Sequence, residues 1–492
     1  MVEEGAVTRR SAEARLADDA CDSAREEKLL ARIALRFAAW SERWFPDAFA
    51  FAGVAVVVVA IAAMLNGAPP LAVSKAFGDG FWSLTTFTLQ QVMVAISGFI
   101  IAVSPPVARL IEKIALLPRS GRGAVAFIAA LTMLASLLSW AISLIFSGLL
   151  ARAIARRSEL RMDYRAAGAA CYLGLGGTWA LGLSSSAAQL QANPGSIPKP
   201  LLQITGVIPF TETIFLWQSG AIVLALLLVS TFVAYWSAPS ESRATTAEDL
   251  GVDVKTKFAQ PRRRERPGEF IEHSPLLTLA IAILGVGWLA QEFSGRNPFV
   301  TLSNLNTYNF ALLMLGLLLH WRPRGFLDAA AKAVPTTGGM LIQYPFYGGV
   351  AAIMTSAVAA GGASLAALLA EFFTHISDKD SFAIVMGLYS AALGFFIPSG
   401  GGKWILEAPY VMQAANDLKV HLGWAVQIYN CAEALPNLIN PFFMLPLLGV
   451  LGLKARDIVG FTALQLMAHA PIVLFLLWLF AHTLTYAPPV MP

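Results

Sequence analysis

A lysine and two glutamates in apolar surroundings are the residues whose chemistry most needs an explanation. Lys403 follows three glycines in FIPSGGGKWILEAPY at 396–410, and Glu407 lies four positions further along the same predicted helix. Glu433 stands in YNCAEALPNLINPFF at 429–443. An ionisable side chain inside a membrane is costly and is usually functional. Glu433 is therefore predicted to carry a coupling proton, to bind a cation or to cap a half-helix, unless it lies at the membrane edge.

The glycine string before Lys403 interrupts an apolar stretch at the expected depth of a bilayer. An unpaired backbone N–H or C=O costs several kcal/mol in lipid, so unwound chain there must be enclosed by protein or line a water-filled cavity. We predict a re-entrant hairpin, with one half-helix ending at Phe396 before Pro398 and the next beginning near Trp404. The glycines permit a positive φ and close approach of a ligand, and a helix N-terminus attracts anions. The predicted substrate-binding residues here are Ser399, Gly400, Gly401, Gly402, Lys403 and Trp404.

A polar surface loop is the alternative for this segment. It would need a full span on each side, and the apolar run that follows the glycines has only about 13 residues, which is short for a span. Two roles also remain open for Lys403. It either faces the substrate or pairs with Glu407, because residues four apart share one face of a helix. Both side chains would do neither if they lay at the membrane surface.

The first half of the chain has a counterpart to this hairpin in SWAIS at 139–143. Ser139, Trp140 and Ser143 are added to the predicted substrate site on this basis, with a tryptophan again available to cover an apolar tail. The segment has no glycine run. Small hydroxyl residues inside a span often serve only helix packing, and that interpretation stays open.

The element after each hairpin is also interrupted, by glycines at 174–196 and by Pro436 with several asparagines at 429–443. Unwound backbone with hydroxyl and amide side chains supplies oxygen donors that suit Na⁺ or a carried proton. The predicted ion-coupling residues are Thr178, Ser184, Ser185, Ser186, Asn430, Glu433, Asn437 and Asn440.

The composition excludes a soluble globular protein. The 492 residues are 57% hydrophobic and 13% charged, whereas soluble proteins carry about 25% charged residues. Apolar runs of about 20 residues recur, which indicates an all-α polytopic membrane protein. No catalytic set, Walker loop or metal-ligand spacing is present, so neither an enzyme, an ATP-driven pump, a metal site nor a bound cofactor is expected. The basic residues lie in loops as topology signals, and no nucleic-acid partner is expected.

The loops and their charges predict the organisation of the chain. Basic clusters before 44, at 109–122, at 152–165, at 243–266 and at 322–332 fall on one side and are predicted to be cytoplasmic. The expected parts are a cytoplasmic amphipathic segment at 1–37, a first transmembrane repeat at 38–236, a cytoplasmic linker at 237–274, a connecting span at 275–300 and a second repeat at 301–486. The expected spans include 48–65, 123–147 and 424–449.

The two halves resemble each other. SKAFGDGFW at 74–82 corresponds to KAVPTTGGM at 332–340, and the segment at 137–155 corresponds to that at 396–414. The span at 48–65 pairs with 305–320. Two repeats of opposite orientation are typical of secondary transporters, and the extra span at 275–293 would invert the second one. Chance similarity between apolar segments is the alternative.

These segments resemble the short-chain fatty acid transporter family of bacteria, which takes up acetoacetate and butyrate. The resemblance runs from about residue 38 to 482. The segments that carry it are RWFPD at 43–47, FGDGFWSL at 77–84, VIPFTETIF at 207–215, NTYNFALLMLGLLLH at 306–320, QYPFYGG at 343–349 and IPSGGGKW at 397–404. It implies an inner-membrane carrier of the wider ion-transporter superfamily, a homodimer, and an elevator-type movement of a transport part against a scaffold.

The chain departs from the family pattern at the predicted site. Lys403 replaces a polar residue that is often histidine, Glu407 replaces a usual glutamine, and Ser139-Trp140-Ala141 replaces Asn-Trp-Gly. The leading hypothesis is a secondary carrier of small monocarboxylates such as acetoacetate or butyrate, in the bacterial inner membrane with the N-terminus cytoplasmic, coupled to H⁺ or Na⁺. The alternatives are a carrier of dicarboxylates or other organic anions, a non-translocating receptor, and a channel.

Overall fold

The computed structural model describes residues 43, 48–254, 264–359, 361–397, 399–440 and 442–491. The predicted amphipathic segment at 1–37 and the helix-ending role of Pro398 lie outside these residues. All named elements in the described residues are helices, and one isolated bridge joins Gly206 to Val490. The predicted all-α class is confirmed.

The helices of the first half begin after the undescribed N-terminal segment and end with a long apolar helix. They are α3 (Ala48–Leu65), α4 (Pro70–Phe81), α5 (Thr85–Ala102), α6 (Pro105–Ile114), α7 (Gly121–Leu138), α8 (Trp140–Ala155), α9 (Tyr164–Leu173), α10 (Ser186–Gln191), α11 (Lys199–Thr205) and α12 (Trp217–Ser237). A short π-helical turn, η3 (Gly174–Thr178), and a 3-10 turn, η4 (Trp179–Leu181), follow α9.

The second half repeats this order from α16 onward, after three connecting helices. Its helices are α13 (Phe270–His273), α14 (Pro275–Phe293), α15 (Pro298–Ser303), α16 (Leu305–His320), α17 (Pro323–Ala333), α18 (Gly338–Ser356), α19 (Leu365–Ile376), α20 (Phe382–Phe396), α21 (Gly400–Asp417), α22 (Leu422–Asn437), α23 (Leu445–Leu451) and α24 (Ala455–Ala481). Six helical segments of the described residues are long and apolar enough to cross a bilayer. The protein is therefore a multi-pass membrane protein.

Two of the expected apolar stretches are divided by breaks, and both breaks fall where the sequence analysis predicts an interruption. The stretch 123–147 is divided at Ser139, whose extended backbone (φ −159°, ψ 129°) separates α7 from α8. The stretch 424–449 is divided where α22 ends at Asn437, before the short α23. Serine at an N-cap accepts a hydrogen bond from the first turn of the next helix, which explains why Ser139 starts a helix as well as ending one. The predicted span at 48–65 coincides with α3.

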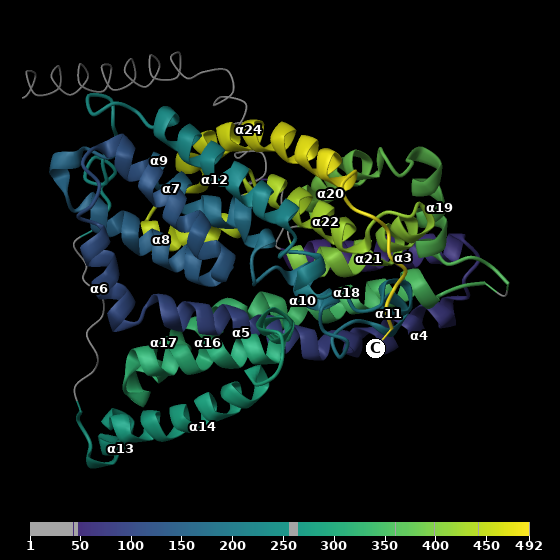
Figure 1. The fold of residues 1–492 in the computed structure, drawn as a ribbon, viewed down its shortest axis with the longest axis horizontal. Coiled ribbons are helices and arrows are strands. Elements are labelled where there is room, and N and C mark those ends of the chain that lie inside the picture. Colours follow the sequence, from purple (N-terminus) through teal and green to yellow (C-terminus); the bar gives the residue numbers. More distant parts are fainter. Residues whose placement is uncertain are drawn as a thin grey trace, which may run out of the picture.

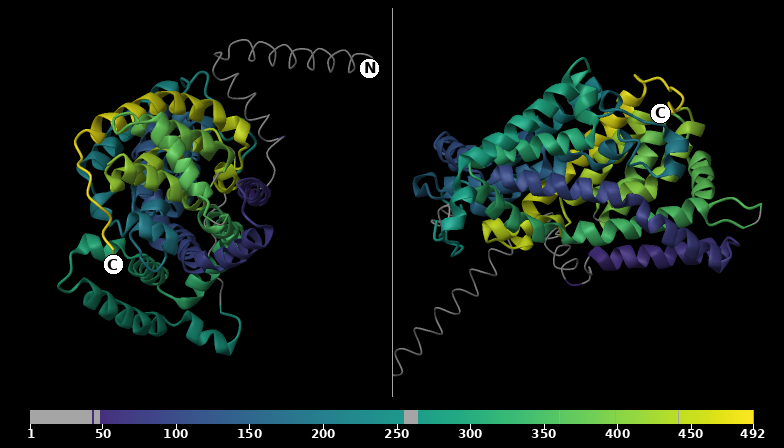
Figure 2. Two further views of the ribbon diagram at one scale, coloured as in Figure 1. Left: turned by 90° about the vertical axis from the view of Figure 1, so that its right-hand side faces the viewer. Right: turned by 90° about the horizontal axis from the view of Figure 1, so that it is seen from below.

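The two halves pack against each other in a reciprocal way. Helices α3 and α4 pack on α18, while their counterparts α16 and α17 pack on α5, the counterpart of α18. A two-fold axis produces this kind of exchange, because contact i to j implies contact j to i. Figure 1 shows α5 beside α16, with α14 outside α16 and α24 on the opposite side of the molecule, and the left view of Figure 2 agrees.

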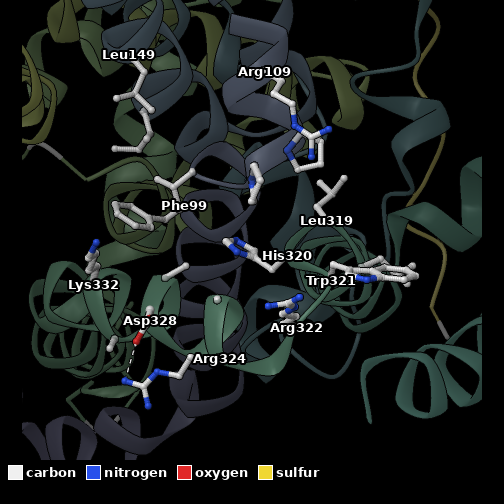
Figure 3. A pocket seen from close by; sticks show the side chains of 18 of the residues that line it. Phe99, Arg109, Leu149, Leu319, His320, Trp321, Arg322, Arg324, Asp328 and Lys332 are labelled. Atoms are coloured by element: carbon white, nitrogen blue, oxygen red, sulfur yellow. Dashed lines mark ion pairs between the residues drawn. The ribbon is translucent and has the colours of Figure 1, made fainter. Parts of the chain in front are cut away.

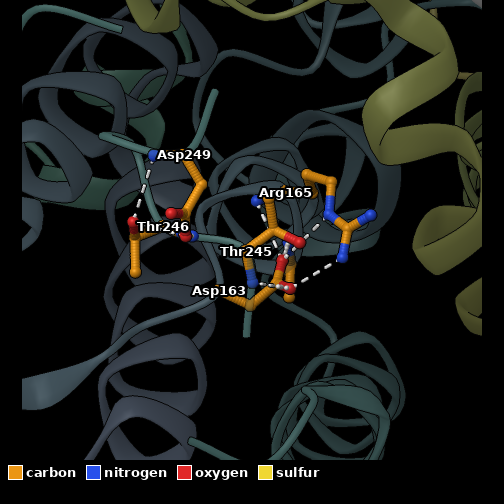
Figure 4. A network of polar contacts seen from close by, with 6 residues as sticks. Asp163, Arg165, Thr245, Thr246 and Asp249 are labelled. Atoms are coloured by element: carbon orange, nitrogen blue, oxygen red, sulfur yellow. Dashed lines mark hydrogen bonds and ion pairs between the residues drawn. The ribbon is translucent and has the colours of Figure 1, made fainter. Parts of the chain in front are cut away.

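The start of the polar linker is held against the end of the first half. Asp163 caps α9, pairs with Arg165 (Oδ2 to Nη2, 2.9 Å) and accepts a hydrogen bond from the backbone N–H of Thr245 (3.0 Å). Thr246 and Asp249 close a small turn beside it (Figure 4). The linker as far as residue 254 is therefore an ordered cover over this end of the bundle.

Candidate functional site

The glycines at 400–402 form the first turn of α21 and are not an unwound loop. Ser399 is the N-cap (φ −158°, ψ 96°), and its Oγ accepts a hydrogen bond from the N–H of Gly402 at 3.2 Å. None of the three glycines has a positive φ, so the expected reason for glycine is wrong. The N–H groups of Gly400 and Gly401 have no acceptor among the described residues, as expected for the start of a helix.

Close packing by aromatic rings explains the glycines instead. A Cβ at Gly400 would lie 2.4 Å from the Trp179 ring, and one at Gly402 would lie 2.3 Å from the Tyr347 ring. Tyr344 Oη would be 2.9 Å from a Cβ at Gly401. All three glycines are buried. The predicted anion site is therefore enclosed by protein, and aromatic side chains of η4 and α18 cover it.

Lys403 is fully buried and lies between two carboxylates. Its Nζ is 3.0 Å from Glu407 Oε1 on α21 and 2.7 Å from Glu433 Oε2 on α22. It also donates to the carbonyl oxygen (2.7 Å) and to Oγ (2.9 Å) of Ser390 on α20, and it lies 4.6 Å from the centre of the Tyr429 ring. Of the two roles left open for Lys403, the structure shows the ion pair.

The two glutamates are also fully buried within the protein. Both have side chains at most 1% exposed. Their second oxygens, Glu407 Oε2 and Glu433 Oε1, have no polar partner among the described residues. Gly394 of α20 leaves room for the Lys403–Glu433 pair, because a Cβ there would lie 2.8 Å from Glu433 Oε2 and 3.2 Å from Lys403 Nζ.

The break at Ser139 in the first half forms hydrogen bonds with neighbouring segments of the same half. Ser139 caps α8, and the N–H of Trp140 donates to Ser184 Oγ at 2.9 Å. Ser143 Oγ donates to the Thr132 carbonyl at 2.8 Å. Ser139 and Ser143 are fully buried. Among the described residues, no hydrogen bond joins Ser139, Trp140 or Ser143 to the start of α21.

The predicted ion-coupling residues are divided among several places. Thr178 forms a hydrogen bond with Ser136 (2.8 Å), whereas Ser185 donates to Asn430 (3.1 Å). Ser186 donates to Gln91 and Asn440 donates to the Phe395 carbonyl. Asn437 is buried with neither amide atom partnered by a described residue. These hydrogen bonds link the predicted residues to different parts of the fold, and their role in ion coupling stays a prediction.

Several buried residues near these positions were missed by the sequence analysis. Gln91 donates to Gln189 Oε1 at 2.7 Å, linking α5 to α10, and Gln427 donates to Ser219 at 2.8 Å. Glutamines inside apolar runs were the available signal. Tyr344 and Tyr347, which cover the start of α21, lie in the QYPFYGG segment already noted for its resemblance.

Two cavities flank the helices that begin at the serine breaks. A cavity of about 1560 Å³ lies between α5, α6, α8, α16 and α17, and Ile145 and Leu149 of α8 face it. A cavity of about 360 Å³ lies between α4, α11, α18 and α21, and Ile405 and Pro409 face it. These are the sixth and tenth residues of α8 and of α21 respectively. The two cavities therefore occupy equivalent positions in the two halves.

The larger cavity has an apolar interior and a basic rim (Figure 3). Phe99, Leu149 and Leu319 contribute apolar side chains to its lining. Arg324 is neutralised by Glu272 and Asp328. By contrast, no carboxylate of the described residues lies within ion-pair distance of five other cations that line the cavity. These are Arg109, Arg152, Arg264, Arg322 and Lys332, whereas Arg156 pairs with Glu112.

Comparison with known proteins identifies the family. The family model for short chain fatty acid transporters matches residues 29–480. The chain belongs to this family. It is 32% identical over 454 residues to a predicted short-chain fatty acid transporter of Escherichia coli (strain K12), covering 92% of this chain and all of that protein. The corresponding Haemophilus influenzae protein is 29% identical, over 90% of this chain and 98% of its own length. The protein is a transporter and not an enzyme.

Two solved transporters share the fold. Neisseria gonorrhoeae MtrF, described as illuminating a class of antimetabolite efflux pumps, superimposes with a TM-score of 0.58 and covers 93% of this chain and all of that chain. The Alcanivorax borkumensis YdaH transporter, described as having an unusual topology, gives a TM-score of 0.59 over 90% of this chain and all of that one. Both are 15% identical to this chain, so the likeness concerns the fold alone.

Proposed function

We propose that the protein is a secondary active carrier of small monocarboxylates, such as acetoacetate or butyrate, across the bacterial inner membrane. The observation that carries the proposal is the buried start of α21, where Ser399 caps a helix whose N–H groups at Gly400 and Gly401 point to an anion site. The substrate carboxylate would rest there after Trp179 and Tyr347 move aside. Membership of the short-chain fatty acid transporter family supports this choice of substrate.

We further propose alternating access by an elevator-type movement of two inverted repeats. The repeated order of helices and their reciprocal packing support two repeats, and the breaks at Ser139 and Ser399 support a hairpin tip in each. The unequal cavities at equivalent places support one open and one closed access route. In the opposite state, the cavity beside Ile405 would be the large one and the cavity beside Ile145 the small one.

The basic rim of the larger cavity supports its role as an anion vestibule on the cytoplasmic side. Cations that have no carboxylate partner raise the local concentration of an anion and speed its encounter with the site. The basic segments at 109–122, 152–165, 243–266 and 322–332 all contribute residues to this lining, which supports a common cytoplasmic side and a cytoplasmic N-terminus.

The experiment is uptake of labelled acetoacetate into proteoliposomes that contain the purified protein. Protein-free liposomes must be subtracted, because undissociated short acids cross lipid unaided. We expect saturable uptake that unlabelled butyrate inhibits. Succinate should inhibit poorly, because Glu407 and Glu433 already pair with Lys403 and leave it no charge for a second substrate carboxylate. Strong inhibition by succinate would favour the dicarboxylate alternative, and absence of saturable uptake of any short acid would contradict the proposal. Light scattering of the purified protein tests the proposed homodimer.

A further inference from the structure

The charges around Lys403 do not balance. One ammonium group stands between the carboxylates of Glu407 and Glu433, and all three side chains are at most 1% exposed. The cluster would carry a charge of −1 if all three groups were ionised. Lys403 is the only cation within ion-pair distance of either carboxylate among the described residues. A buried charge without compensation is strongly disfavoured, so the group takes up or loses a proton instead.

The other groups that face the cluster do not supply the missing charge. They are tyrosine hydroxyls, which are neutral at physiological pH, together with Ser390 on α20. The tyrosines are Tyr172 on α9, Tyr344 and Tyr347 on α18, Tyr389 on α20, Tyr410 on α21 and Tyr429 on α22.

Lys403 also has fewer N–H donors than there are acceptor atoms around its ammonium group. An ammonium group has three N–H donors, but Nζ lies within 3.0 Å of four acceptor atoms, two on Ser390 and one on each glutamate. Glu407 Oε2 and Glu433 Oε1 remain without a polar partner among the described residues. A proton shared by the two carboxylates removes both the excess charge and part of this shortage.

We propose that Lys403, Glu407 and Glu433 form a proton-carrying site and that the driving ion of the carrier is H⁺. One carboxylate takes a proton from hydronium on the uptake side, which forms its O–H bond and leaves water. On the other side that O–H bond breaks, the proton passes to water, and the carboxylate is restored. The ammonium group occupies the space between the carboxylates that a Na⁺ ion would need. The inference rests on the proposed transport of monocarboxylates and selects the coupling ion within it.

The position of the cluster explains how proton and substrate are coupled. Ser399 and Lys403 are one helical turn apart on α21, so an anion at the helix start lies beside the cluster. Like charges in a buried site repel strongly. The substrate anion therefore binds only when the carboxylate pair holds its proton. One proton moves with one anion, and the transport step is electroneutral.

The test compares driving forces in proteoliposomes, with labelled acetoacetate and initial rates corrected for protein-free liposomes. Wild-type uptake should respond to an imposed pH gradient, inside alkaline, and should ignore both a valinomycin-imposed membrane potential and a Na⁺ gradient. The Glu407→Gln substitution leaves a neutral Lys403–Glu433 pair. Its uptake should lose the response to the pH gradient and become sensitive to membrane potential, because an anion then moves alone. Glu433→Gln should behave in the same way, since the proton is shared.

The control variant is Glu371→Gln, which removes an exposed carboxylate (68% exposed) on α19, a helix that packs beside α21. It should keep the wild-type responses. Uptake by the wild type that a Na⁺ gradient or a membrane potential drives would overturn the inference, and this result does not depend on whether the glutamine variants fold. A glutamine variant whose uptake still responds to the pH gradient would also overturn it. Exchange of labelled for unlabelled substrate needs no gradient. If the wild type shows no such exchange, the proposed function is contradicted. If it exchanges substrate but its uptake does not respond to the pH gradient, only the proton site is contradicted.

Discussion

Gly402 is the residue at which the covered start of α21 can be tested most simply. A Cβ added there would lie 2.3 Å from Cδ2 and 2.4 Å from Cε2 of Tyr347. Overpacking of this kind costs about 1–3 kcal/mol, and Gly402→Ala should lower the melting temperature and abolish uptake. Gly287→Ala in α14 is the matched control, since no atom lies within 4 Å of its added Cβ.

A second substitution identifies the cause of this effect. If the clash with the Tyr347 ring is responsible, Tyr347→Ala should restore the stability of Gly402→Ala in a double-mutant cycle, with an interaction energy of about 1 kcal/mol or more. Additive effects of the two substitutions, measured by thermal unfolding in detergent, would show that the two residues act independently.

The importance of individual residues was predictable where a charge or a glycine interrupts an apolar run. Lys403 and Glu433 stand out for this reason, because no lipid-facing role suits them. Their contact was not predictable, since it joins two helices whose register only the fold determines. The glycines were predicted for an unwound loop, yet they lie in a helix. A single sequence does not distinguish a glycine needed for positive φ from one needed for a neighbouring ring.

Helix capping provides a prediction for the element that begins at Ser399. Ser399→Ala removes the hydrogen bond to the N–H of Gly402 and should cost about 1 kcal/mol of stability. Ser364→Ala is the matched control, because Ser364 caps α19 in the same way (3.1 Å to Ala367) outside the proposed site. Both variants should lose similar stability, but only Ser399→Ala should raise the half-saturation concentration for acetoacetate. Equal half-saturation concentrations would contradict an anion site at this helix start.

Whole helices were predictable where the apolar pattern is continuous, and their breaks were less so. The span at 48–65 coincides with α3 because nothing interrupts its run of alanine and valine. Ser139 divides an equally apolar run without a proline or glycine beside it, and its N-cap role depends on a backbone conformation that tertiary packing imposes. The apolar pattern alone therefore left 123–147 as one stretch, and only the correspondence of SWAIS to the second-half hairpin indicated a break there.

At the scale of the whole molecule, the two cavities predict unequal access to equivalent positions. In a variant with the three native cysteines replaced by serine, Ile145→Cys should react with a membrane-impermeant thiol reagent added from the basic side. Ile405→Cys should react slowly from the opposite side, because its cavity has about 360 Å³ against about 1560 Å³. Substrate with a proton gradient should shift the two rates in opposite directions. Parallel changes at both positions would contradict alternating access.

The repeat was visible in the sequence as a shared order of segments, whereas the way the halves interlock was not. Helices of one half pack on the other half, as α3 does on α18 and α16 does on α5. Such contacts join residues more than 200 positions apart and leave no local signal in the pattern of apolar residues. The cavities depend on this packing and were likewise not predictable.

The most direct measurement of the central claim is entrance counterflow. Proteoliposomes loaded with unlabelled butyrate are diluted into a trace of labelled acetoacetate, with equal pH and equal Na⁺ on both sides, and protein-free liposomes are subtracted. A carrier with one site that faces the two sides in turn must exchange the two acids. The account predicts that labelled acetoacetate transiently accumulates inside butyrate-loaded proteoliposomes above its equilibrium level. The Gly402→Ala variant should show no such overshoot. Label that enters without an overshoot, or does not enter at all, would contradict it.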